Sequence, residues 1–295
     1  MTDPKMLAQI KDGQGFIAAL DQSGGSTPGA LKGYGVAEDA YSTDEQMFGL
    51  IHAMRSRIIT SPCFNGDKVI GAILFEKTMD GEAGGEPVPE ALWKRGVVPF
   101  LKVDKGLEDE ADGVKLMKPM PDLDALLERA AAKGVFGTKM RSVIERASPI
   151  GIAAIVAQQF AVAEQISTHD LMPMIEPEVS IKSPDRDAAD RMLLAELVEA
   201  LDALPEDRQV ILKLTLPAEA NLYAPLVDHP RVLRVVALSG GFSRDEACRQ
   251  LAQNRGMIAS FSRALLSDLR SQMSDDEFSH SLGTAIDEIH SASIA

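Results

Sequence analysis

Eight short apolar runs that alternate with amphipathic segments predict a single (β/α)8 barrel for this chain. Alternation of strand and helix implies parallel strands with helical crossovers, because a tight turn cannot join a parallel pair. A length of 295 residues suits eight such units, and no repeat or break in composition divides the expected domain, 1–295. An open doubly wound sheet is the alternative, but no GxGxxG motif follows the first run.

The predicted strands are runs of β-branched and aliphatic residues bounded by glycine, proline or polar residues. They cover residues 16–22, 69–76, 98–104, 136–141, 171–178, 210–216, 233–239 and 257–261. Between them, apolar residues at helical spacing predict helices over 123–133, 152–168 and 188–203. Residues 80–89, and at its start the segment 24–44, are rich in loop-forming residues, so we expect loops there.

Charge and cysteine content narrow the class of protein. A net charge of −14 argues against partners such as nucleic acid or an anionic membrane, because long-range repulsion opposes both. Two cysteines make no disulfide framework and favour a reducing compartment. The first ten residues lack the pattern of a signal peptide, and the longest apolar runs, such as 69–75, are short for a membrane span. We therefore expect a cytoplasmic protein.

The most unusual position is Lys213, which stands inside the apolar segment VILKLTLP of residues 210–217. A buried ammonium group must be paired or lose its proton, because an unpaired buried charge is energetically costly. A neutral lysine is a nucleophile that forms Schiff bases with carbonyl substrates. The alternative is a lysine near the strand end whose ammonium reaches solvent. Lys213 favours an enzyme over a binding module.

Other polar residues gather at the carboxyl ends of the predicted strands, where functional residues of (β/α)8 barrels lie. On the third, fourth and fifth strands they are two residues apart and so share one face. Each such pair is equally compatible with a structural ion pair. The strand-end residues are Asp21, Lys102, Asp104, Lys139, Arg141, Glu176, Glu178, Ser239, Ser260, Ser262 and Arg263.

Two glycine-containing segments are candidate phosphate sites. SGGS at 23–26 follows the first strand, and SGG at 239–241 follows the seventh, with Arg263 after the eighth. Backbone N–H groups freed by glycine near a helix amino terminus suit phosphate, and barrel phosphate sites often follow the seventh and eighth strands. An ordinary turn is the alternative for each segment.

Taken together, these segments resemble the class I fructose-1,6-bisphosphate aldolases of the short bacterial kind. The resemblance spans residues 15–266. It implies a lyase with no metal and no cofactor, which cleaves D-fructose 1,6-bisphosphate reversibly to dihydroxyacetone phosphate and D-glyceraldehyde 3-phosphate, a step of glycolysis and gluconeogenesis. The matching segments are LDQSGGST at 20–27, LKVDKG at 101–106, TKMR at 138–141, IEPE at 175–178, LKL at 212–214, LSGG at 238–241 and SRAL at 262–265.

The same resemblance assigns catalytic roles. Lys213 resembles the Schiff-base lysine, Glu176 the proton-transferring acid/base, and Asp21 the aspartate that assists carbon–carbon cleavage. Glu176 suits protonation of a carbinolamine hydroxyl if its pKa is raised. Like charge on Lys102 and Lys139 would favour neutral Lys213. Glu178 is expected to orient or pair with Lys139.

Substrate binding is implied at both ends of the sugar. Ser23, Ser26 and Lys102 would lie toward the C6 phosphate. The C1 phosphate would be held by Ser239, Gly240 and Arg263. The implied substrate-binding set is completed by Gly241, Lys139 and Arg141.

Three other functions remain to be weighed. Another Schiff-base aldolase or a transaldolase acting on a phosphosugar needs one phosphate site, whereas the two clusters favour a bisphosphate. A zinc-dependent aldolase needs histidines at strand ends, and none of the five stands there. A barrel that only binds a partner would not need Lys213, Glu176 and Asp21 together.

The chain also ends in SASIA, without the terminal tyrosine of the animal-type enzymes, so no residue is assigned to proton exchange at C3.

Overall fold

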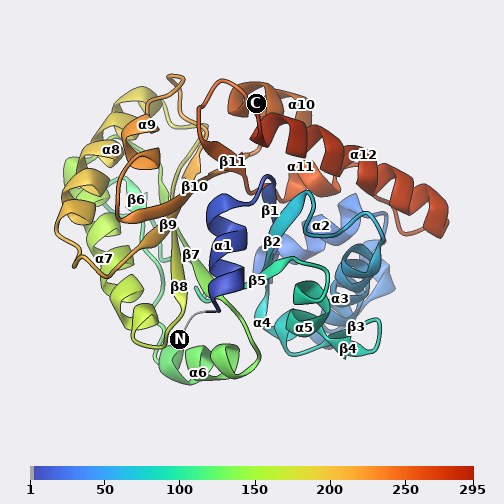
Figure 1. Ribbon diagram of the computed structural model, residues 1–295. Helices are drawn as coiled ribbons and strands as arrows, with labels where there is room; N and C mark the ends of the chain where they lie inside the picture. Colours follow the sequence, from blue (N-terminus) through green and yellow to red (C-terminus); the bar gives the residue numbers. More distant parts are fainter. Residues whose placement is uncertain (1–2) are drawn as a thin grey trace.

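The computed structural model describes residues 3–295 and shows a nearly closed barrel of eight parallel strands in a single domain (Figure 1). The barrel is completed between its last and first strands, where Ala19 N donates to Phe261 O at 3.1 Å. In barrel order the strands are β1 (Phe16–Leu20), β2 (Val69–Leu74), β5 (Val98–Lys102), β7 (Gly137–Ile144), β8 (Met172–Val179), β9 (Val210–Thr215), β10 (Val232–Leu238) and β11 (Met257–Ala259).

Helices surround the barrel (Figure 1). The crossover helices bury apolar stripes against the strands, as Leu193 and Leu197 do on α8. The helices are α2 (Thr27–Gly33), α3 (Asp44–Thr60), α4 (Glu76–Met79), α5 (Val88–Trp93), α6 (Leu123–Ala132), α7 (Pro149–Ser167), α8 (Arg186–Asp202), α9 (Ala224–Val227), α10 (Arg244–Leu251), α11 (Arg263–Leu266) and α12 (Asp275–Ser293).

The interior of the barrel is a packed apolar core below the strand ends. Phe100 and Phe136 meet edge to face with ring centroids 5.4 Å apart. Helix α1 (Pro4–Asp12) adds Met6 and Ile10 to this core from the amino-terminal side of the barrel. Because side chains fill the interior, polar chemistry is confined to the carboxyl ends of the strands.

All eight predicted strands exist, and most end within a residue or two of the prediction. The expected loops need correction. Within 24–44 the chain forms α2 and two short 3₁₀ turns, Gly24–Ser26 and Glu38–Ala40. Within 80–89 it forms a small hairpin of β3 (Glu82–Ala83) and β4 (Glu86–Pro87) and the start of α5. Glycine and proline there mark turns and helix starts rather than a structureless segment.

Among residues 3–295, α7 is the one helix long and apolar enough by composition to span a membrane. It packs against β8 and α8, and it buries Ile152, Ile155 and Ile166. One further short strand, β6 (Val114–Lys115), pairs antiparallel with the outer end of β7.

Candidate active site

The carboxyl ends of the strands open into one cavity of about 860 Å³. Alternation along each strand sends the residue two positions above the apolar core into this space. Apart from Gly241, every residue predicted for the site lines the cavity: Asp21, Ser23, Ser26, Lys102, Lys139, Arg141, Glu176, Lys213, Ser239, Gly240 and Arg263. The structure therefore brings together residues that span most of the sequence.

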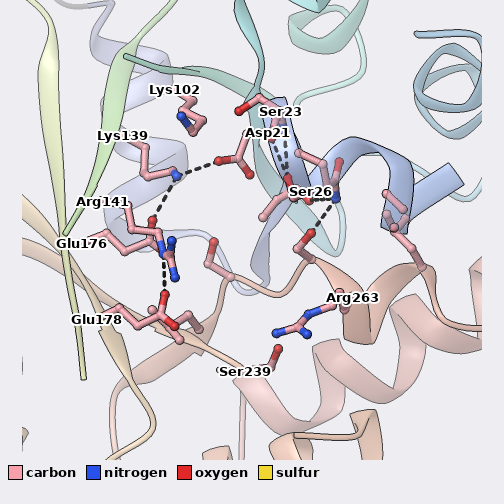
Figure 2. A pocket seen from close by; sticks show the side chains of 18 of the residues that line it. Asp21, Ser23, Ser26, Lys102, Lys139, Arg141, Glu176, Glu178, Ser239 and Arg263 are labelled. Atoms are coloured by element: carbon pink, nitrogen blue, oxygen red, sulfur yellow. Dashed lines mark hydrogen bonds and ion pairs between the residues drawn. The ribbon is translucent and has the colours of Figure 1, made fainter. Parts of the chain in front are cut away.

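Lys139 on β7 is the centre of a buried charge network (Figure 2). Its Nζ is 2.7 Å from Asp21 Oδ2, 3.0 Å from Glu176 Oε2 and 4.0 Å from Asp104 Oδ2. Because Lys139 is only 2% exposed, these three carboxylates replace the hydration shell of its ammonium group. The arrangement fixes one cation among acids from β8 and from the segments that follow β1 and β5.

Lys213 on β9 is paired with Glu176 on the neighbouring strand. Its Nζ is 3.1 Å from Glu176 Oε1, and the two residues are 3% and 4% exposed. Parallel pairing sets this contact, because Ile175 stands opposite Leu212 and the next residue on each strand is Glu176 or Lys213. The interpretation of Lys213 as a solvent-reaching strand-end lysine is therefore wrong.

The charges of this network decide the protonation state of Asp21. Burial raises the pKa of this carboxyl, but Lys139, and after it Lys213, outweigh burial and hold the pKa well below its usual range. For Lys139, burial lowers the pKa, and the charges of Asp21 and Glu176 raise it far above its usual value. Asp21 is thus a carboxylate and Lys139 an ammonium at neutral pH.

Glu176 departs from the expectation of a raised pKa. Burial raises its pKa, but the charges of Lys139 and Lys213 outweigh burial, so the pKa of Glu176 is lowered in the free protein. Its backbone N–H donates to Gln159 Oε1 at 2.8 Å, and Gln159 is itself held by Ser142. Glu176 is therefore ionised beside Lys213 and oriented from α7.

One of two further ion pairs differs from its expected role, and the other is a structural pair that the sequence left open as an alternative. Glu178 was predicted to pair with Lys139, yet Glu178 Oε2 accepts from Arg141 Nε at 2.5 Å. The register explains the difference: Val143 stands opposite Glu178, one pleat further out than Glu176. Lys102 is also engaged, because its Nζ donates to Asp104 Oδ1 at 2.6 Å and to Asp104 O at 2.7 Å.

The loop after β10 and the start of α11 form the first candidate anion-binding cluster, which we define as Ser239, Gly240, Gly241 and Arg263. Gly240 has φ +60°, and a Cβ there would lie 2.6 Å from Ile181 Cγ2, so the tight turn requires glycine. A Cβ on Gly241 would lie 3.3 Å from Arg263 Nη2, which places the guanidinium against this loop. Backbone donors and a guanidinium suit a phosphate group.

The loop after β1 forms the second cluster, defined as Ser23, Ser26 and Lys102. The Ser26 hydroxyl accepts from Ser23 N at 3.0 Å and donates to Ser23 O at 2.9 Å. This local hydrogen-bonded turn carries the hydroxyls into the cavity wall. Figure 2 shows Ser23 and Ser26 near Asp21, while Ser239 and Arg263 lie together on another side of the cavity.

Several residues at the cavity carry no role in the sequence interpretation. Ser260 and Ser262 stand at a strand end and were noted only for that position; the buried Ser260 hydroxyl has no hydrogen-bond partner among residues 3–295. Gln22 and Tyr34 also line the cavity, and no local sequence pattern marks them, because contacts between distant segments bring them there. In the described chain no group of three His, Cys, Asp or Glu side chains is arranged to hold a metal ion.

The sequence model of the family described as fructose-bisphosphate aldolase class-I matches residues 6–219. The chain belongs to this family. As a class I aldolase it is a carbon–carbon lyase of the Schiff-base type, and the family supports aldol cleavage through a lysine.

Solved structures share the fold of this class I aldolase at low sequence identity. Fructose-bisphosphate aldolase from Plasmodium falciparum, solved in complex with TRAP and an inhibitor, superposes with a TM-score of 0.80 at 18% identity, covering 98% of this chain and 93% of its own. A Corynebacterium glutamicum protein gives 0.58 at 15% identity, covering 99% and 92%. An archaeal fructose 1,6-bisphosphate aldolase gives 0.56 at 11% identity, covering 97% and 98%.

Proposed function

We propose that this class I aldolase cleaves D-fructose 1,6-bisphosphate reversibly to dihydroxyacetone phosphate and D-glyceraldehyde 3-phosphate, with Lys213 as the Schiff-base nucleophile. The observation that carries the proposal is the buried contact of 3.1 Å between Lys213 Nζ and Glu176 Oε1, in a cavity with an anion-binding cluster on each side. A nucleophile and its proton acceptor within hydrogen-bond reach are the requirement for covalent catalysis at a ketone.

The first step needs a neutral amine. Glu176, as a carboxylate, takes a proton from the Lys213 ammonium across the 3.1 Å contact. The amine then attacks the C2 carbonyl carbon, and transfer of one proton from the nitrogen to the C2 oxygen gives a carbinolamine with a hydroxyl on C2. Lys213 enters this step with its acceptor in place, since the Gln159 side chain holds the backbone of Glu176.

Dehydration of the carbinolamine uses the same carboxyl group, which now donates the proton that it accepted in the first step. Loss of the Lys213 charge removes one of the cations that lower the pKa of Glu176, so this pKa rises and the carboxyl group stays protonated while the carbinolamine forms. Glu176 then returns its proton to the C2 hydroxyl, which leaves as water and gives the iminium. The lowered pKa of the free protein is thus compatible with acid catalysis later in the cycle.

Cleavage of the C3–C4 bond needs a base for the C4 hydroxyl. Asp21 is a carboxylate held by Lys139 at 2.7 Å, and it accepts this proton while the bonding electrons move into the iminium to form an enamine. Because the pKa of Asp21 is held low, we expect proton transfer to accompany bond cleavage rather than precede it. The aldehyde product leaves, and protonation at C3 and hydrolysis of the iminium release the ketone.

The two clusters support a substrate with phosphate at both ends. The Ser239–Arg263 side offers a guanidinium and glycine N–H groups, which match the planar donor geometry that phosphate prefers. On the other side, Lys102 and two serine hydroxyls line the same cavity. A sugar bisphosphate would span both clusters with its C2 carbonyl near Lys213.

The decisive experiment is trapping of the Schiff base. The protein is incubated with dihydroxyacetone phosphate, reduced with borohydride and digested, and the modified peptide is mapped by mass spectrometry. We expect the adduct on Lys213 and none in Lys213→Met. An adduct on another lysine, or no adduct, would refute the mechanism. An adduct on Lys213 without turnover of fructose 1,6-bisphosphate would instead indicate another Schiff-base aldolase or a transaldolase.

A further inference from the structure

Gln22 links two parts of the cavity wall that are 240 residues apart in sequence. Its Nε2 donates to Ser262 Oγ at 2.5 Å and to Ala19 O at 3.2 Å. Its Oε1 accepts from Arg55 Nη2 at 3.3 Å. Both the nitrogen and the oxygen of the side-chain amide therefore make hydrogen bonds, and these bonds connect α3 with the residue before α11.

Arg55 anchors this link from behind the cavity. It lies on α3, is 1% exposed, and donates from Nη1 to Thr78 Oγ1 at 2.8 Å and from Nη2 to the Gln22 carbonyl oxygen. None of the ion pairs formed within residues 3–295 includes Arg55, so neutral acceptors solvate its charge. A buried cation held by such acceptors is costly to displace, which fixes Gln22 in both backbone and side chain.

Gln22 and Ser262 are each next in sequence to a residue of one of the two clusters. Gln22 stands between Asp21 and Ser23, at the start of the cluster formed by Ser23, Ser26 and Lys102. Ser262 precedes Arg263, the guanidinium of the other cluster. Figure 2 labels Ser23, in the segment after β1, and Arg263, at the start of α11, and the link joins these two segments. One hydrogen-bonded chain, Arg55–Gln22–Ser262, therefore connects both anion-binding clusters.

We propose that Gln22, held by Arg55 and bonded to Ser262, is a positioning residue that fixes the separation of the two anion-binding clusters and so makes the enzyme selective for substrates with a phosphate at each end. This inference rests on the proposed aldolase function. A substrate with two phosphates gains from clusters already placed at the right distance, since ordering them costs nothing when it binds. A substrate with one phosphate uses one cluster and gains little.

The test compares fructose 1,6-bisphosphate with fructose 1-phosphate as substrates of the full chain. Gln22→Met keeps the length of the side chain and removes its donor and acceptor. We expect kcat/KM for the bisphosphate to fall about tenfold, the effect of losing roughly one net hydrogen bond, while kcat/KM for the monophosphate changes less than about twofold. The selectivity ratio, rather than activity, is the readout.

Gln158→Met is the matched control. Gln158 on α7 is also partly buried, and its amide accepts from Met117 N and donates to Met117 O, both at 2.9 Å, away from the cavity. Both variants lose a glutamine bridge and should unfold at lower urea concentration than the wild type. We expect Gln22→Met alone to change the selectivity ratio, because a purely structural defect would lower kcat/KM for both substrates together.

A second variant tests the contact if Gln22→Met does not fold. Ser262 is partly exposed, so Ser262→Ala should fold, and we expect it to lower the ratio in the same direction. The double variant should lose no more than Gln22→Met, because both changes break one contact. Equal losses on both substrates, additive losses, or an unchanged ratio would overturn the inference. Failure of the wild type to form the Lys213 adduct would instead refute the proposed function.

Discussion

The buried charge centre and the exposed rim of the cavity are built on different physical principles. In the centre, Lys139, Glu176 and Lys213 come from neighbouring strands and are at most 4% exposed. At the rim, Ser26, Gly241 and Arg263 are exposed; they lie in a 3₁₀ turn, in the loop after β10 and at the start of α11. Strand register therefore fixes the centre, whereas the rim depends on turns and on contacts between loops.

The charge centre and the rim of the cavity also differ in how their charged groups are paired. In the centre each charge is paired with another protein group, and these pairs set the pKa values on which proton transfer depends. At the rim, Arg263 forms no ion pair with the rest of the described chain, and its guanidinium stays available to an anionic ligand. Substitutions in the centre should therefore change kcat, and substitutions at the rim should mainly change KM.

The largest expected effect comes from Glu176→Gln. The amide cannot take a proton from Lys213 or return it to the carbinolamine, so we expect kcat for sugar bisphosphate cleavage to fall by about 10²- to 10⁴-fold with a smaller change in KM. Steady-state kinetics measures both values, and borohydride trapping should show slower adduct formation. Glu178→Gln is the control, since its carboxylate pairs with Arg141 and should cost less. A loss in kcat below tenfold would contradict proton transfer by Glu176.

Arg263→Ala addresses the rim. The loss of a charge-assisted contact to phosphate should raise KM by roughly 10- to 100-fold and leave kcat within about threefold. Inhibition by inorganic phosphate measures the same contact without turnover, and its inhibition constant should rise in parallel. If kcat falls instead and KM does not change, the rim takes part in the chemistry and the contrast with the centre does not hold.

The pH dependence of stability should come from the centre. Asp21 and Glu176 have lowered pKa values in the folded chain. Their contribution to the free energy of unfolding is therefore complete above their pKa values in the unfolded chain, near 3.8 and 4.5. It is lost as the pH falls toward their lower pKa values in the folded chain. We expect urea unfolding to show a loss of stability between pH 6 and pH 3 that is smaller by about 1 kcal/mol in Asp21→Asn than in the wild type. Arg263→Ala should follow the wild-type curve.

The smallest effect is expected for Ser26→Ala. The Ser26 hydroxyl closes a local turn with Ser23 and is exposed, so its loss should lower kcat/KM by less than about threefold and stability by about 1 kcal/mol or less. Kinetics on the bisphosphate and a urea titration check both values. A loss as large as that of Arg263→Ala would mean that the turn itself, rather than the guanidinium, holds the phosphate.

The centre was predictable because parallel strands impose a rule on distance. Lys213 and Glu176 are on successive strands, and the carboxyl ends of successive strands meet at one end of the barrel. The partner of Glu178 was not predictable in the same way. Its pairing with Arg141 rather than Lys139 depends on the register of β7 and β8, in which Arg141 stands opposite Glu176 and is the nearer cation to Glu178.

The hydrogen-bonded chain Arg55–Gln22–Ser262 is harder to predict from the sequence than the charge centre. Arg55 stands at helical spacing from Ile51, Ile58 and Ile59, which marks an arginine on the buried face of α3. A buried arginine requires acceptors, yet the sequence does not show where they come from. Gln22 and Thr78 become its partners only when α3, the end of β1 and α4 pack together.

The barrel, its eight strands and the family resemblance follow from the amino-acid sequence alone, and the sequence also predicts the catalytic set, because hydrophobic periodicity and motifs at strand ends are local properties. The packed fold was needed to see which charges pair, why the pKa of Glu176 is lowered rather than raised, and how Gln22 joins the two candidate anion-binding clusters. These features depend on distances of a few ångströms between residues far apart in the chain, and such distances exist only after the strands and loops have packed.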